Sequence, residues 1–523
     1  FIITCFIGLA GISIVFTALS LFIPLGNVYA QLLLLIPALY WAYKKKLSAS
    51  LLKKIIARSK EYSTAVIAGS LSAILLILVM HANWINHPDT LAYHAQNIQW
   101  IEKYRVVPGT ANLYLTYGIQ SSWFVLSALF SFSFTGTHAL SFINAVVLCW
   151  FIIFIGQQLQ ACLSGRKKIA NGIGWLLLLA FSFWSYTQIR LTASSGSPDF
   201  IATMYTWLII YLFINRPASG SVALLILFLS CFAVTIKLSA LPCLLFGLYA
   251  WFRRIEMNGV KKIIYPLLIT FVVLAPSLTR NVISSGYLVF PSAVPDVFAV
   301  DWKVPASSLA VTQQYITAYA RTNVNYNNEQ IQSVLKMSMS DWIPAWWQLR
   351  SWADRIILLG CPILLILSLF SFKKLFHRKN EVAIVALLFS LTAIVFWFIQ
   401  APDPRFGFGF LMAVPGILLY LMTKENDFSF IKKQWLSFGL FVFSAAAFSY
   451  TGYRCVHFFN AHDLLAPAGV IDTKYEILNC DRININMPHV DQDCGNAPVP
   501  CATTSCIHFM ARGNEVKDGF KAK

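Results

Sequence analysis

The chain has 523 residues, of which 58% are hydrophobic and only 12% are charged. Soluble domains carry about twice that share of charge, and disordered chains need low hydrophobicity, so both classes are excluded. The formal net charge of +18 would fit nucleic-acid binding, but the positions of the charges along the chain point to membrane topology instead.

Apolar runs recur along most of the sequence, and a membrane-spanning helix needs about 20 mostly apolar residues. We therefore expect an all-α polytopic membrane protein with about 13 transmembrane helices. The stretch 122–134 is apolar but short, and we treat it as a segment that does not cross. The predicted spans are 1–22, 28–44, 62–84, 138–157, 172–187, 199–214, 221–238, 240–252, 263–278, 356–372, 382–399, 408–423 and 435–451.

Almost all of the excess positive charge falls in short loops between alternate spans. Basic short loops stay in the cytoplasm, which predicts a multi-pass protein of a bacterial cytoplasmic (inner) membrane with its N-terminus inside and its C-terminus outside. The first span is interpreted as an anchor rather than a signal peptide. The predicted organisation is a transmembrane domain, 1–451, with long outward loops at 85–121 and 279–355, followed by an outward tail, 452–523.

The tail contains a cluster of cysteines. An outward tail lies in an oxidising compartment, where disulfides form, so at least two of these cysteines are expected to pair, although the sequence does not fix the connectivity. Bridges from Cys501 to Cys506 and from Cys480 to Cys494 are two of the options. Zinc is the alternative at Cys501 and Cys506, but the tail has no Cys-x-x-Cys pair, so no metal site is predicted there. The disulfide candidates are Cys480, Cys494, Cys501 and Cys506.

The first outward loop contains an acid directly after a predicted span. Asp89 opens a run with helical spacing, 90–104, which we expect to form an interfacial helix. Asp is favoured as a helix N-cap, so capping is one interpretation of this residue. The other is a carboxylate at the mouth of a membrane cavity that removes a proton from a hydroxyl group. Tyr93 and His94 would lie beside Asp89 and position an acceptor.

A second acid, Asp199, begins the span 199–214 at the same predicted membrane level. It could also be part of a helix start, because Ser197-Pro198-Asp199 is a helix-initiating pattern. Two carboxylates at one level could bind a divalent metal or share the roles of base and positioning group. The sequence does not decide between these alternatives.

Three cations, Lys237, Arg280 and Arg405, lie at the outer ends of spans, where the positive-inside rule does not require them. Arginine pairs with phosphate oxygens through a two-pronged fork, and lysine acts as a point charge. The set predicts a shared outward cavity that binds the phosphate of a lipid. Snorkelling of single side chains is the alternative.

The large outward loop, 279–355, is rich in aromatic residues. Some of them belong to the interfacial aromatic belt, and others could pack against the rings of a sugar. They include Tyr287, Phe290, Phe298, Trp302, Tyr315, Tyr319, Tyr326, Trp342, Trp346, Trp347 and Trp352.

In its overall plan the chain resembles the GT-C superfamily of integral-membrane glycosyltransferases. It has many spans, a long first outward loop that opens with an acid just after a span, a second acid farther on, outward arginines and a C-terminal outward region. The chain is also similar to a group of polytopic membrane proteins common in Bacteroidetes-type bacteria. The stretches that carry the similarity are 89–94 (DTLAYH), 107–113 (VPGTANL), 280–287 (RNVISSGY), 290–292 (FPS), 301–305 (DWKVP), 402–406 (PDPRF) and the cysteine-containing tail.

The resemblance implies an enzyme that moves a sugar from a polyprenyl-phosphate carrier to a hydroxyl acceptor on the outer side of the membrane, with Asp89 as catalytic base. The implied partners are this lipid-linked donor and membrane lipids, with envelope proteins as further partners, and no nucleic acid. The chain lacks a paired acid at 89–90 and the WWD-type motif of oligosaccharyltransferases, so protein N-glycosylation is not expected and metal dependence stays open. The alternative is a non-enzymatic envelope component: a lipid or polysaccharide exporter, or a scaffold subunit of a larger complex.

Overall fold

The computed structural model describes residues 1–45, 53, 61–83, 87–136, 139–255, 259–370, 377–425, 432–458, 473–489, 493–503 and 506–523. Helices dominate this part of the chain, and the strands are few and short.

Every predicted span contains a helix in the described chain. Eight of the described helices are long and apolar enough to cross a membrane, namely α1 (Ile2–Leu19), α4 (Thr64–Ala82), α8 (Phe142–Leu163), α13 (Lys261–Ser285), α17 (Trp352–Leu369), α19 (Glu381–Gln400), α20 (Pro404–Glu425) and α21 (Lys433–Phe458). The shorter ones are α2 (Val28–Lys44), α9 (Ile169–Trp184), α10 (Asp199–Asn215), α11 (Gly220–Ile236) and α12 (Cys243–Arg254). The protein is thus a helical membrane protein, and thirteen crossings remain a prediction.

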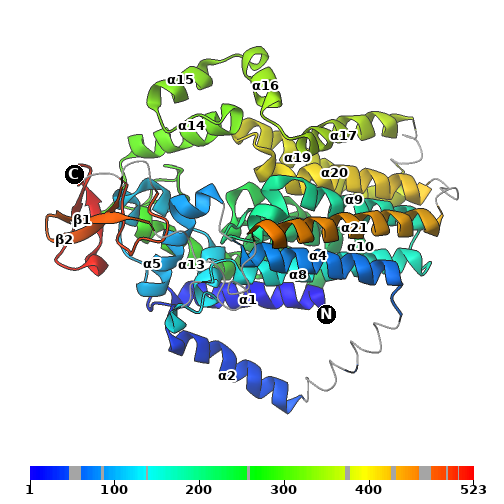
Figure 1. Ribbon diagram of the computed structural model, residues 1–523, viewed down its shortest axis with the longest axis horizontal. Coiled ribbons are helices and arrows are strands. Elements are labelled where there is room, and N and C mark those ends of the chain that lie inside the picture. Colours follow the sequence, from blue (N-terminus) through cyan, green and yellow to red (C-terminus); the bar gives the residue numbers. More distant parts are fainter. Residues whose placement is uncertain are drawn as a thin grey trace.

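The long helices run side by side and form one bundle (Figure 1). Its core is built from large apolar side chains of α10 and α11, such as Tyr205, Phe213 and Phe232, which are fully buried. The Tyr205 hydroxyl donates a hydrogen bond to the Phe6 carbonyl of α1 (2.9 Å), so this buried polar group is satisfied. Helix α2 lies apart from the bundle and leaves most of its apolar side chains exposed, as a lipid-facing helix would.

The first long loop folds at the end of the bundle that also carries the tail, and we call this end the tail end (Figure 1). It contains a π-helical turn η1 (Thr90–His94), α5 (Ala95–Lys103), α6 (Thr110–Leu113), η2 (Leu115–Gly118) and α7 (Ser122–Leu129). With eight residues, α7 is about 12 Å long, too short to cross a bilayer. The helix predicted over 90–104 is present, but Gln96, Asn97 and Gln99 are buried rather than facing water.

The tail covers Gln96, whereas Asn97 bonds within the first loop, to the Ile119 carbonyl (3.4 Å). Gln96 donates hydrogen bonds to the carbonyl oxygens of Ala497 (2.7 Å) and Gly495 (3.2 Å). The first residues of the tail, 452–458, belong to α21. Farther on, the tail forms two antiparallel hairpins, β1 (Tyr475–Cys480) with β2 (Ile483–Pro488), and β3 (Phe509–Ala511) with β4 (Phe520–Ala522).

Two disulfides staple the tail, Cys480–Cys506 and Cys494–Cys501. The prediction that at least two of the four cysteines pair is confirmed. The pairings named from the sequence, Cys501–Cys506 and Cys480–Cys494, are not the ones formed, because strand pairing and the packing of 494–501 on the first loop decide which cysteines meet.

Strand β4 docks on the turn at 107–109. The Phe520 N–H donates to the Pro108 carbonyl (3.0 Å), and Gly109 has φ +67°, a left-handed conformation that favours glycine. A Cβ on Gly109 would lie 1.9 Å from the Phe520 carbonyl oxygen. This close approach gives a structural reason for glycine in the VPG stretch.

The second long loop contains α14 (Ala306–Thr322), α15 (Asn328–Lys336) and α16 (Met339–Gln348), which lie along one side of the bundle (Figure 1). Its DWKVP stretch joins the tail, because Arg512 of the tail makes a two-pronged ion pair with Asp301 (2.8 and 3.0 Å). Both loops and the tail therefore meet at one end of the bundle.

Candidate active site

Four charged side chains from distant parts of the sequence meet at the tail end of the bundle, and we call them the charge cluster. Arg405 Nη1 lies 2.9 Å from Asp89 Oδ2, and Arg405 Nε lies 3.2 Å from Asp199 Oδ2. Lys237 pairs with the other oxygen of Asp199. Two carboxylates and two cations balance, so the cluster has no net charge.

The ends of helices position these groups. Asp199 is the first residue of α10, Lys237 follows the last residue of α11 in extended conformation, and Arg405 is the second residue of α20. The Arg405 backbone N–H donates to the Asp403 carboxylate (2.9 Å), which fixes the start of α20. The ring of Phe406 lies under both cations, 3.9 Å from Lys237 Nζ and 4.8 Å from the Arg405 guanidinium.

Helix capping does not explain the two acids. Asp89 precedes η1 but makes no side-chain capping hydrogen bond, and at the start of α10 it is Ser197 Oγ, not the Asp199 carboxylate, that accepts a backbone N–H (3.4 Å). Both carboxylates instead point at Arg405. Asp89 thus occupies the N-cap position of η1, but its carboxylate pairs with Arg405 instead of capping the turn.

The two acids differ in accessibility. The side chain of Asp89 is 30% exposed, whereas that of Asp199 is 4% exposed. Burial disfavours the charged form of Asp89, but the positive charge of Arg405 outweighs it and lowers the pKa of Asp89 below its ordinary value. Asp89 is thus an ionised, partly exposed carboxylate, and Asp199 is a buried one that pairs with both cations.

The structure adds His87, which the sequence analysis did not single out. His87 is 1% exposed, and neither of its ring nitrogens has a hydrogen-bond partner among the described residues. Burial lowers its pKa, so the ring is neutral. The one signal in the sequence that could have pointed to His87 is its position two residues before Asp89, the candidate base.

His87 together with Asp89 and Asp199 could hold a metal, because one ligand atom from each lies within 4.8 Å of the others. Nitrogen and carboxylate donors suit divalent transition metals. However, Arg405 already pairs with both carboxylates, and Lys237 pairs with one. A divalent ion would have to displace Arg405 from a balanced cluster, so the charges present fit the group poorly.

The other two predicted positioning residues lie next to the cluster without a hydrogen bond to it. His94 Nδ1 is 3.0 Å from Thr90 Oγ1, and its ring packs on Tyr93 and Phe124. Burial lowers the pKa of His94 to about 3, so His94 is neutral. Burial and the charge of Asp89 raise the pKa of Tyr93 well above its ordinary value, so its hydroxyl stays protonated.

Other segments surround Asp89. The Gly495 N–H of the tail donates to the Leu91 carbonyl (2.9 Å), two residues after Asp89. Burial and the charge of Asp89 raise the pKa of Asp493. On α14, burial raises the pKa of Tyr315 to about 12, with Asp89 among the contributing charges. The tail and the second long loop therefore lie close enough to Asp89 to feel its charge.

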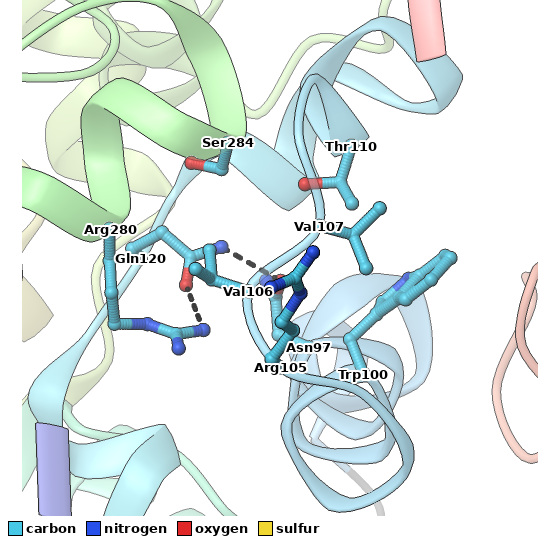
Figure 2. A pocket seen from close by; sticks show the side chains of 9 residues that line it. All are labelled: Asn97, Trp100, Arg105, Val106, Val107, Thr110, Gln120, Arg280 and Ser284. Carbon is cyan, nitrogen blue, oxygen red and sulfur yellow. Dashed lines mark hydrogen bonds between the residues drawn. The ribbon is translucent and has the colours of Figure 1, made fainter. Parts of the chain in front are cut away.

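The structure brings Lys237 and Arg405 together but gives Arg280 different neighbours. Arg280 donates to Ser20 Oγ (2.8 Å) and to Gln120 Oε1 (3.2 Å). It lines a small pocket between α13 and α5 (Figure 2). A single cavity shared by all three cations is not what these contacts show.

A family profile described as "Domain of unknown function (DUF8201)" matches residues 1–412. The chain belongs to this family. The matched region includes all members of the charge cluster and ends within α20, before the tail. No curated protein matches the chain, and no solved structure does.

Proposed function

We propose that the protein is a membrane glycosyltransferase of the GT-C plan, which transfers a sugar from a polyprenyl-phosphate carrier to a hydroxyl acceptor. The observation that carries the proposal is Asp89: an ionised, partly exposed carboxylate held by Arg405 at the end of a membrane bundle. At the membrane surface, a base in this position would meet a sugar that is linked to the phosphate of a lipid carrier.

In the proposed reaction, Asp89 accepts the proton of the acceptor hydroxyl. The oxygen attacks the anomeric carbon with inversion, and the bond from that carbon to the phosphate oxygen breaks. The electron pair leaves with the phosphate, which yields the polyprenyl phosphate. Because phosphate is a good leaving group, no general acid is required, and positioning and electrostatics would supply most of the rate.

The remaining members of the charge cluster would support this step. Asp199 is buried and pairs with both cations, which makes it a positioning residue. Arg405 keeps Asp89 ionised, and Arg405 and Lys237 supply positive charge for the leaving phosphate. Tyr315 and Tyr319, whose ring centroids are 5.8 Å apart on α14, are candidates for packing against the sugar.

The same proposal assigns a place in the cell. The N-terminus would lie in the cytoplasm and the tail on the outer side of a bacterial cytoplasmic membrane. Disulfide-bonded cysteines in the tail support this side, because disulfides persist in oxidising compartments.

A non-enzymatic envelope component is the second candidate, and one observation favours it. The four charges of the cluster cancel, and a balanced ion-pair network can simply fix how helices pack. Such a scaffold or exporter subunit would not need Asp89 to be accessible.

Donor turnover tests the proposal. The purified protein in lipid vesicles would be supplied with radiolabelled sugars on polyprenyl phosphate, and in parallel with the same sugars as nucleotide derivatives, together with an envelope extract as acceptor. Loss of label from the polyprenyl phosphate alone is the expected result. No turnover of any lipid-linked sugar across a panel of hexoses, pentoses and amino sugars would contradict the proposal.

A further inference from the structure

Arg280 takes part in none of the ion pairs of the charge cluster and lines a pocket whose other lining residues are not members of that cluster. Arg280 is 5% exposed, and its guanidinium bonds only to neutral oxygens in the described chain, those of Ser20 and Gln120. Among the residues that the structure describes, no ion pair includes Arg280. A buried cation without a counter-charge is costly, because burial removes its hydration.

The pocket next to Arg280 is rich in hydrogen-bond donors (Figure 2). A second cation, Arg105, lines it from an exposed position. Trp100, which is 6% exposed, also lines it, and the indole N–H of this residue has no hydrogen-bond partner in the described chain. Two guanidinium groups and an unsatisfied N–H match an acceptor with several oxygens rather than a cation or a neutral ligand.

We propose that this pocket binds a phosphate group, with Arg280 as the buried anchor and Arg105 as the exposed arm. The cavity is about 10 Å³, close to the volume that one water needs, so its lining has to open to admit the phosphate, and Arg105 is an exposed member of that lining. The two sources of such a group are a lipid headgroup and a free phosphate ion. Arg280 lies on α13, whose residues Leu267, Leu268 and Phe271 are exposed and apolar, and this lipid-facing helix favours the headgroup.

The site does not depend on sugar transfer, so binding alone tests it. Thermal unfolding of the detergent-solubilised protein would be followed during titration with phosphatidylglycerol, with diacylglycerol, which lacks the phosphate, and with inorganic phosphate. We expect phosphatidylglycerol to raise the unfolding temperature by a few degrees and diacylglycerol to leave it unchanged. An equal rise with inorganic phosphate would support the site with a soluble source.

Variants tie the effect to this pocket. Arg105→Gln changes an exposed side chain and should weaken the apparent affinity at least tenfold without loss of fold, and Arg280→Lys should do the same while it keeps a cation. Arg512→Gln is the matched control, because Arg512 is paired with Asp301, and it should leave the affinity unchanged. Equal affinity in wild type, Arg105→Gln and Arg280→Lys, or no stabilisation by either phosphate compound, would overturn the proposal.

Discussion

Replacing Arg405 by Gln should destabilise the protein more than any loss of a surface ion pair. Arg405 is 9% exposed and contacts both Asp89 and Asp199, and removing one partner of a buried pair costs about 3–5 kcal/mol. The carboxylates that remain have oxygens within 4.8 Å of each other, and two like charges at that distance repel by about 3 kcal/mol at an effective dielectric constant of 20. Because Asp89 is partly exposed, we expect a loss of about 3 kcal/mol.

Unfolding by sodium dodecyl sulfate in mixed micelles would measure this loss. The double change Arg405→Gln with Asp89→Asn leaves the neutral pair of Asp199 and Lys237. It should recover more than half of the stability that Arg405→Gln alone loses. Arg512→Gln, in an exposed pair, should cost about 1 kcal/mol or less. A loss below about 1 kcal/mol for Arg405→Gln, or a double variant that is less stable than the single one, would refute the electrostatic reasoning.

Three further predictions concern the surroundings of the cluster. The pKa of His94 is about 3 in the folded protein and 6.5 when unperturbed. As the pH falls, His94 therefore takes up a proton in the unfolded state before it does so in the folded state. The free energy of unfolding should therefore fall by up to about 1.4 kcal/mol per pH unit as the pH drops from 6.5 towards 3. The variant His94→Gln should show a smaller dependence on pH when unfolding is measured across this range. Gly109→Ala should release the tail to limited proteolysis, whereas Gly136→Ala, also at positive φ but with open space around it, should not; equal cleavage would argue against the close approach. If the tail is outside, a membrane-impermeant maleimide should label exposed Cys455 in intact cells, and labelling only after lysis would reverse the topology.

Hydropathy predicted the helices well because the signal is local: about 20 apolar residues in a row need a membrane or a core wherever they fold. The helix after Asp89 was also predictable from spacing. The burial of Gln96 on this helix was not, because the segment that covers it lies about 400 residues later, at Gly495 and Ala497. For the same reason the sequence could not choose the partners of Cys480 and Cys494.

The candidate site shows the same division. The sequence singled out Asp89, Asp199, Lys237 and Arg405 as unusual charges at helix ends, and these four residues do meet. It could not tell that the cations pair with the acids, because the contacts join helices far apart in the chain. His87 was missed because burial without a hydrogen-bond partner is a tertiary property. The hydrogen bonds of Arg280 to Ser20 and Gln120 were not predictable either, because they join segments that lie far apart in the sequence.

The most direct test of the central claim is sugar transfer by the Asp89→Asn variant. Asn keeps the size of the side chain and removes the base, and Asp89 makes no capping hydrogen bond that would be lost. Transfer from the lipid-linked donor that the turnover assay identifies should fall at least ~100-fold, the usual scale for a general base. As a control, an unfolding midpoint close to that of the wild type would show that the helix bundle of the variant is intact. Full transfer by Asp89→Asn would contradict the assignment of Asp89 as the catalytic base.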